Sequence, residues 1–490
     1  MRNILLAAIA LLAFACGPAS SQDNSGSEPT APAEIPREPA EPTDIVLKLH
    51  GAQAGEVAYL IGHYADQRFR ADSATVGNDG NIRFQREEPY EPGFYYIFIP
   101  NQAVVQLLMD RDQAMTLSAS NDDVVGSMQV DGSKNMELLY RNLRFERDQR
   151  PAFDEVNQKI KQATPGSARY AELKREREKL FDERKAHLKE LFENNPDAFY
   201  TAFKKAGQNP DFEEPRKADG TLDTALQVYR FRSDFWDGVN FDDERLLHTP
   251  VIFNKLKRYM TELTVQNQDS IIASTDALLQ KVVDRESRQD YFKFFANWIT
   301  LQYEPTKTTL MDPEKVFVHM VENYFTRERA FWSDTTEVYG LQLRASEMAN
   351  SLVGNDAPNV IAPGPDGSSK ELMALDAPYI VVYLYNPTCE HCMEQSPKLV
   401  RFYERWKNQG VDVYGIAIDT ERDEWLNYIS KTGMDQWTNV FDPTNRSIYK
   451  TYYVDITPEV YVVGPDRKII AKNLNVNQLE TVIRRDMAKR

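Results

Sequence analysis

The chain reads YIVVYLYNPTCEHC from Tyr379 to Cys392, where a continuous apolar run gives way to a short polar loop and two cysteines. Such an uninterrupted apolar run is typical of a strand buried on both faces of a parallel sheet. The pattern from Cys389 to about Lys407 is helical, so the cysteine pair falls where a buried strand ends and a helix begins. Unpaired backbone N–H groups and the positive end of the helix dipole meet there, and both stabilise a thiolate.

The spacing of the two cysteines predicts thiol–disulfide exchange. This reaction needs an exposed nucleophilic thiolate and a second thiol close enough to resolve the mixed disulfide. We assign Cys389 as the attacking thiol and Cys392, one helical turn further on and more buried, as the resolving thiol. Glu390 and His391 lie between them and are the candidates for tuning the thiol pKa. A protonated or hydrogen-bonding His391 would favour the thiolate and make the pair more oxidising, whereas a solvent-exposed loop histidine would not.

Three other uses of the cysteine pair fit the sequence less well. A zinc site needs two further ligands, and the sequence has neither a second pair at this spacing nor a nearby histidine pair. Haem attachment needs a histidine directly after Cys392, where Met393 stands. A purely structural disulfide remains as an alternative, but at this spacing it closes a small loop and stabilises little. We therefore expect no metal, and no cofactor beyond the redox-active disulfide Cys389–Cys392.

The elements around the pair predict an α/β domain over residues 350–490. A second buried strand is expected at 411–418, with helices at 421–430, 447–453 and 477–487. Two short strands, at 460–463 and 468–471, flank the turn Gly464-Pro465-Asp466.

On these residues the segment resembles a thioredoxin-fold domain of the TlpA/ResA type. Pro397 stands five residues after Cys392, where that fold kinks its active-site helix, and Thr457-Pro458 directly precedes a strand. The resemblance implies that Pro458 is the cis-proline of a loop that faces the dithiol and keeps metals off it. In that family the loop, here Thr457 and Pro458, offers backbone groups to an extended substrate. The alternative is a simple turn before the strand.

The chain departs from that family at two positions. Thr388 stands where an aromatic residue usually precedes the first cysteine, and Glu394 is shifted from the position of the acid usual after the motif. Both departures leave the dithiol chemistry in place. They leave open the reduction potential of the cysteine pair and its substrate preference. Peroxiredoxins share this fold, but they need a proline and a threonine further ahead of the cysteine than Pro387 and Thr388 stand.

The N-terminus predicts export and a lipid anchor. Residues 1–15 combine one positive charge with an uncharged apolar run, as in a signal peptide, and the run is too short for a membrane span. The segment Ala13-Phe14-Ala15-Cys16 resembles a bacterial lipobox, which implies that Cys16 is lipidated. The alternative is an ordinary cleavage site after Ala15. Residues 16–43 hold six prolines and no aromatic residue, which predicts an extended tether behind the lipidated cysteine.

Two regions without a catalytic cluster lie between the tether and the cysteine pair. Short apolar runs separated by turn residues predict a small β-sandwich-like domain at 44–125, with Asp79-Gly80 as a hairpin turn between 74–76 and 82–84. From 131 to 349 the pattern is helical. Residues 136–160 and 170–192 predict a helical hairpin, with a partner-binding coiled coil as the alternative. The fold class is therefore multidomain: all-β, then α-helical, then an α/β thioredoxin fold at 350–490.

Composition limits the partners. The chain has 58 basic and 74 acidic residues, and this net charge of −16 repels a phosphate backbone. We find no concentrated basic patch, so we expect no nucleic-acid partner. The three-region order, with the segments 235–241 and 243–250, is similar to multidomain thioredoxin-like lipoproteins of Bacteroidota.

These observations predict an exported lipoprotein at the periplasmic face or outer membrane of a Gram-negative cell envelope. We expect it to exchange disulfides with protein thiols, with the reductase direction favoured and a membrane electron donor as partner, because the periplasm holds no reducing buffer. The alternative is a surface binding or assembly lipoprotein whose thioredoxin-like domain is a scaffold.

Overall fold

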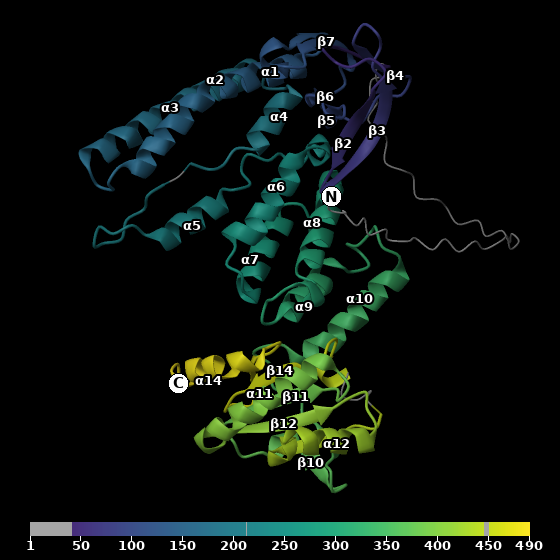
Figure 1. Ribbon diagram of the computed structural model, residues 1–490, viewed down its shortest axis with the longest axis vertical. Helices are drawn as coiled ribbons and strands as arrows, with labels where there is room; N and C mark the ends of the chain where they lie inside the picture. Colours follow the sequence, from purple (N-terminus) through teal and green to yellow (C-terminus); the bar gives the residue numbers. More distant parts are fainter. Residues whose placement is uncertain (1–41, 212, 445–449) are drawn as a thin grey trace, which may run out of the picture. The chain divides into compact units, whose positions relative to one another are not determined.

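The computed structural model describes residues 42–211, 213–444 and 450–490, which belong to one compact unit from Glu41 to Arg490 (Figure 1). The predicted signal peptide, Cys16 and nearly all of the tether lie outside the described residues. The first residues of the helix predicted at 447–453 also lie outside them, and 450–452 are helical. In the part of the chain that is described, no helix is both long and apolar enough to span a bilayer.

The N-terminal region forms two four-stranded sheets. One has the order β4-β1-β7-β8 and contains β1 (Thr43–His50), β4 (Asn81–Arg86), β7 (Ala114–Ser120) and β8 (Gln129–Asp131). The other has the order β3-β2-β5-β6 and contains β2 (Val57–Tyr64), β3 (Gln67–Thr75), β5 (Gly93–Phe98) and β6 (Val105–Met109). Buried residues alternate with more exposed ones along β1, and Leu47 of one sheet joins the same apolar cluster as Leu60 of the other. The predicted all-β region is confirmed.

The hairpin predicted around Asp79-Gly80 is wrong. A tight turn is present, in which the Gly80 N–H donates to the Gly77 carbonyl at 3.0 Å. However, β3 pairs with β2 and β4 pairs with β1, so the turn carries the chain from one sheet to the other. Turn residues specify a reversal of direction and not the pairing partner. Pairing with β1 places Ile82 and Phe84 of β4 in the shared core.

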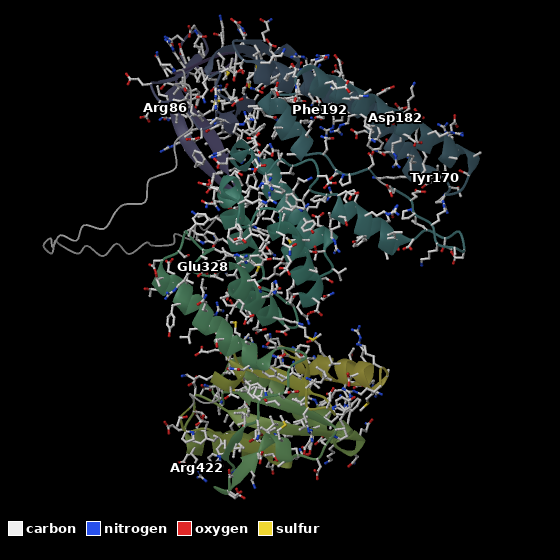
Figure 2. The ribbon with its side chains drawn as sticks, turned by 180° about the vertical axis from the view of Figure 1, so that it is seen from behind. Arg86, Tyr170, Asp182, Phe192, Glu328 and Arg422 are labelled. Carbon is white, nitrogen blue, oxygen red and sulfur yellow. The ribbon has the colours of Figure 1, made fainter. Side chains whose placement is uncertain are left out.

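Residues 134–351 are largely helical, as predicted. The elements are α2 (Lys134–Gln162), α3 (Ala168–Asn194), α4 (Phe199–Ala206), α5 (Thr224–Ser233), α6 (Pro250–Arg258), α7 (Gln268–Leu279), α8 (Gln289–Gln302), α9 (Pro313–Tyr324) and α10 (Thr335–Met348), after the single turn α1 (Val124–Ser127). Helices α2 and α3 form an antiparallel hairpin, linked by the ion pair of Arg141 with Glu190 at 2.7 Å. Figure 2 labels Tyr170 near the start of α3 and Phe192 near its end.

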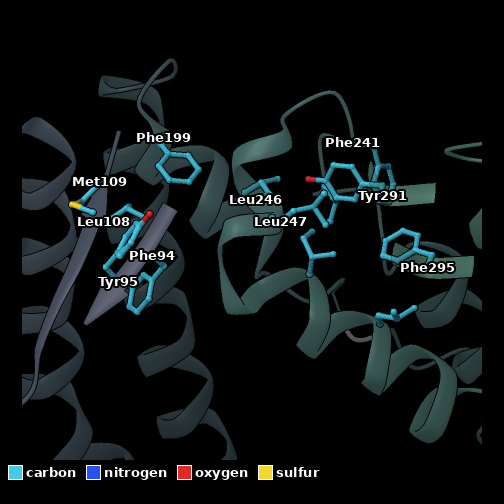
Figure 3. Close-up of a cluster of buried hydrophobic side chains, with 14 of the residues drawn as sticks. Phe94, Tyr95, Leu108, Met109, Phe199, Phe241, Leu246, Leu247, Tyr291 and Phe295 are labelled. Carbon is cyan, nitrogen blue, oxygen red and sulfur yellow. The ribbon is translucent and has the colours of Figure 1, made fainter. Parts of the chain in front are cut away.

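The β region and the helical region share one hydrophobic core. A single cluster of buried side chains runs from β1 to α10. Figure 3 shows part of it, with Phe94 and Leu108 from the sheet, Phe199 from α4, and Leu246 and Phe295 from the helical side. Each region therefore covers apolar side chains of the other, so they do not form two separate cores.

The C-terminal region contains a five-stranded sheet in the order β13-β12-β11-β14-β15. Its strands are β11 (Tyr379–Tyr385), β12 (Val411–Ala417), β13 (Thr438–Phe441), β14 (Glu459–Val463) and β15 (Ile469–Ala471). Strands β11, β12 and β13 run parallel, and β14 is antiparallel to β11.

Both faces of this sheet are covered. Helices α11 (Glu390–Trp406), α12 (Arg422–Thr432) and α14 (Leu479–Met487) contribute to the core that contains Tyr383. The opposite core contains Ile380 and is completed by the small hairpin of β9 (Ile361–Pro363) and β10 (Ser369–Glu371), through Ala362. Every residue of β11 is buried, which explains its continuous apolar run. The predicted thioredoxin-like α/β fold is confirmed.

Candidate active site

The cysteine pair lies at the junction of β11 and α11. Strand β11 ends at Tyr385, Cys389 is the N-cap residue of α11, and the helix begins at Glu390. Cys389 is partly exposed, whereas Cys392 is fully buried one turn into the helix. Both are free thiols. This arrangement presents one sulfur to a partner and keeps the second behind it.

The loop before Cys389 is held by a side chain that sequence analysis did not single out. The Asn386 Oδ1 atom accepts hydrogen bonds from the backbone N–H and the hydroxyl of Thr388, both at 2.7 Å. Its Nδ2 atom donates to the Asp419 carbonyl at 3.0 Å, at the end of the neighbouring strand β12. The Cys389 N–H donates to the Asn386 carbonyl at 3.1 Å. The position of Cys389 is therefore set by two adjacent strands.

The loop before β14 faces the first cysteine. The Thr457–Pro458 peptide is cis, as the resemblance predicted. The Cys389 thiol donates to the Thr457 carbonyl at 3.2 Å, although the two residues are 68 positions apart. Pro458 lines a hollow of about 270 Å³ together with His391 and Gln395. The fold thus brings the predicted loop residues and the dithiol together.

Burial and hydrogen bonding give the two thiols different acidities. Partial burial alone would raise the pKa of Cys389, but hydrogen bonds to the Thr457 side chain and to backbone N–H groups of the first helical turn lower that pKa below its ordinary value. Burial raises the pKa of Cys392 to about 12, and the neighbouring Cys389 adds to the rise. Cys389 is therefore the thiol that ionises first as pH rises, while Cys392 keeps its proton to a higher pH.

The two residues between the cysteines lie on the rim of the site. Glu390 and His391 are both exposed on the first turn of α11. His391 contributes to the lowered Cys389 pKa through its backbone N–H. Glu394 points to Lys398, with 2.6 Å between Oε1 and Nζ. The acidic side chain after the motif therefore forms an ion pair with Lys398 on the helix surface.

A buried hydroxyl network lies in the same core as the second cysteine and was not predicted. The Ser396 hydroxyl lies 2.9 Å from the Tyr383 hydroxyl and 2.8 Å from that of Tyr428. Ser396 follows Cys392 by four positions, so both project from the same face of α11. The four-residue spacing of Cys392 and Ser396 could have pointed to Ser396 from the sequence. Its tyrosine partners could not be found in this way, because they come from β11 and α12.

A buried ionic cluster adjoins the cis-proline loop and also escaped sequence analysis. Glu459, the first residue of β14, is buried, and burial raises its pKa to about 8. Lys472 Nζ lies 3.4 Å from Glu314 Oε2, and both side chains are almost fully buried. Asp312, the N-cap residue of α9, is also buried, and its Oδ2 atom accepts a backbone N–H at 2.7 Å. The cluster joins the start of α9 to the strand pair that follows the loop.

Residues 353–472 match the AhpC/TSA family. Residues 44–139 match a domain of unknown function, DUF4369, and residues 221–337 match another, DUF5106. The multidomain architecture predicted from the sequence is thus confirmed.

The thioredoxin-like domain has curated relatives and solved structural neighbours. The thiol-disulfide oxidoreductase ResA of Bacillus subtilis is 25% identical over 117 residues, which is 24% of this chain and 64% of that protein. A domain of a possible thiol-disulfide isomerase from Cytophaga hutchinsonii is 29% identical, covers 28% of this chain and 95% of its own, and has a TM-score of 0.27. A thioredoxin-like protein from Bacteroides caccae is 17% identical, covers 56% of this chain and 99% of its own, and has a TM-score of 0.43. The alignment thus spans a little under two thirds of the ResA sequence.

Proposed function

We propose that this chain is an extracytoplasmic, membrane-tethered thiol–disulfide oxidoreductase that acts on protein disulfides in the reducing direction. The observation that carries the proposal is the division of roles between the two thiols. Cys389 is partly exposed with a lowered pKa, and Cys392 is buried with a pKa raised to about 12. The matched relatives named as thiol-disulfide oxidoreductases support the same chemistry for the C-terminal domain.

The catalytic cycle uses both thiols in turn. The Cys389 thiolate attacks one sulfur of a substrate disulfide presented along Thr457 and Pro458, forms a mixed disulfide, and expels the other substrate sulfur as a thiolate. Loss of the negative charge on Cys389 removes one of the causes that raise the pKa of Cys392. Cys392 then gives up its proton and attacks the Cys389 sulfur. The second substrate thiolate leaves, and two electrons have passed from the dithiol to the substrate.

The oxidised pair must be reduced again by a partner. A membrane electron donor with a dithiol would return two electrons and two protons to Cys389 and Cys392. The predicted signal peptide and lipidated Cys16 support a place for this cycle outside the cytoplasm, at the periplasmic face or outer membrane. The tether would then hold the folded unit near the donor.

Trapping of the mixed disulfide tests the proposal. In cells that express Cys392→Ala, the resolving step is blocked, so covalent adducts through Cys389 should accumulate and disappear on treatment with dithiothreitol. The matched control is Cys389→Ala, which keeps a single cysteine in the motif but lacks the attacking thiol. Equal adducts in the two variants, or none in either, would contradict the mechanism.

The direction of exchange is tested by the equilibrium reduction potential. We would titrate the full chain carrying Cys16→Ser, which leaves two thiols, against glutathione. A potential near or below about −250 mV supports a reductase that needs an electron donor, and one near about −120 mV would make the pair an oxidant. A pair that cannot be cycled would favour the alternative of a binding or assembly lipoprotein with a thioredoxin-like scaffold.

A further inference from the structure

A second hollow continues from the one beside the cis-proline loop toward the helical region. It has a volume of about 630 Å³ and shares several lining residues with the smaller hollow beside the cysteines, including Ile456, Asn473 and Asn475. One of its walls comes from the cis-proline loop and from residues 473–482. The other wall comes from residues 305–314, which lead from α8 into α9. The helical region therefore lines a hollow that adjoins the loop in contact with the reactive sulfur.

The wall formed by residues 305–314 is anchored at both ends. At one end, Arg344 donates to Glu304 at 2.5 Å and to the Tyr453 hydroxyl at 2.9 Å, just before the cis-proline loop. At the other end, the Asn473 amide donates to both Glu314 carboxylate oxygens, at 3.0 and 3.1 Å. A segment held in this way presents a fixed surface, because its ends cannot separate from the C-terminal domain without breaking charged contacts.

The chemistry of the lining suits an uncharged polypeptide segment. Met311 and Ile456 are exposed apolar side chains, at 38% and 67% of their surface. The lining also offers hydroxyl and amide groups, such as those of Thr309 and Asn475, and includes no Lys or Arg. The acidic side chains of the lining are compensated: Asp455 pairs with Arg344 at 3.5 Å and Glu314 with Lys472 at 3.4 Å, and burial raises the pKa of Glu459 to about 8. An acidic segment would find no Lys or Arg in this lining to pair with, whereas an apolar one would cover Met311 and Ile456.

We propose that residues 305–314 form one wall of a substrate groove and select protein substrates whose reactive cysteine is flanked by an extended, apolar, non-acidic segment. The inference rests on the proposed exchange reaction, because the groove is continuous with the loop that contacts Cys389. It gives the helical region a part in specificity. Met311 and Thr309 are exposed side chains of this wall.

Single-turnover oxidation of the reduced chain carrying Cys16→Ser tests the groove. The probes are oxidised glutathione and two short disulfide-linked peptide dimers, one with leucine and valine around the cysteine and one with glutamate. We expect the apolar peptide to react at least about tenfold faster than the acidic one. Met311→Glu should slow the apolar peptide by about tenfold and leave the glutathione rate unchanged. Thr309→Glu should also slow the reaction of the apolar peptide and leave the glutathione rate unchanged.

The matched control is Met487→Glu. Met487 lies on α14 and is 39% exposed, close to the 38% of Met311, but it does not line the groove. It should leave all three rates unchanged. Equal rates with the two peptides, or an effect of Met311→Glu no larger than that of Met487→Glu, would overturn the groove while exchange itself stands. Failure of glutathione and both peptides to oxidise the dithiol would instead overturn the proposed function, and the groove with it.

Discussion

Replacing Lys472 with methionine tests whether the buried ionic cluster holds the C-terminal domain and the start of α9 together. The Lys472 side chain is 1% exposed, and its ammonium lies 3.4 Å from a Glu314 oxygen. It also acts on the buried carboxyl groups of Asp312 and Glu459, whose pKa values it lowers against the effect of burial. Methionine keeps most of the volume of lysine but removes the charge, so three carboxyl groups lose their cation.

The expected loss of stability follows from burial. Removing one partner of a buried ion pair costs about 3–5 kcal/mol, because the other charge remains without compensation. In domains of about 150–250 residues each kcal/mol lowers Tm by about 2–4 °C, and on that scale Lys472→Met should lower it by roughly 6–20 °C. The matched control is Lys468→Met. Its ion pair with Asp356 is 3.0 Å long, but the two side chains are 47% and 85% exposed. Such a surface pair contributes about 0–1 kcal/mol.

The effect should depend on pH. Burial raises the pKa of Glu459 to about 8 and that of Asp312 to about 6, above their unfolded values near 4. The stability that these groups contribute is therefore complete below about pH 4 and is lost as pH rises through those folded values. Without Lys472, ionisation of both groups costs more, so the difference from wild type should be larger at pH 8 than at pH 5.

Differential scanning calorimetry of wild type and both variants at pH 5 and pH 8 measures these differences. A loss for Lys472→Met no greater than that for Lys468→Met would refute the argument from burial. A large loss of equal size at the two pH values would refute the assignment of raised pKa values to the neighbouring carboxyl groups.

Three further predictions concern the dithiol. Iodoacetamide at neutral pH should alkylate Cys389 at least about tenfold faster than Cys392, because the pKa of Cys392 is raised to about 12. Residue-resolved mass spectrometry measures the two rates, and equal labelling would contradict the prediction. Ser396→Ala should lower the free energy of unfolding by about 1–3 kcal/mol, because two buried tyrosine hydroxyls lose their partner. Denaturant titration measures this loss, and an unchanged midpoint would count against the hydroxyl network. Asn386→Ala removes the two hydrogen bonds to Thr388 and should slow the reaction of Cys389 with oxidised glutathione severalfold, whereas an unchanged rate would mean that the backbone alone holds the loop.

Local patterns predicted the elements that depend on neighbouring residues. The apolar run 379–385 is a strand buried along its whole length, and the helix after it begins at the position expected from the cysteine pair. The turn at Asp79-Gly80 was equally clear, yet its strands pair with other partners. A turn depends on the conformations of a few residues, whereas strand pairing depends on which apolar faces the whole chain can bury.

The sequence by itself determined the dithiol, its place at a helix N-terminus and the order of the three regions. The tertiary structure alone decided which distant groups surround it: the Thr457 carbonyl at Cys389, the tyrosine hydroxyls at Ser396, and Glu314 at Lys472. The physical reason is that helix starts and strand patterns follow from neighbours in the chain, while these contacts join residues far apart in sequence. The pKa values of the groups that make these contacts depend on burial, and burial is a property of the packed fold.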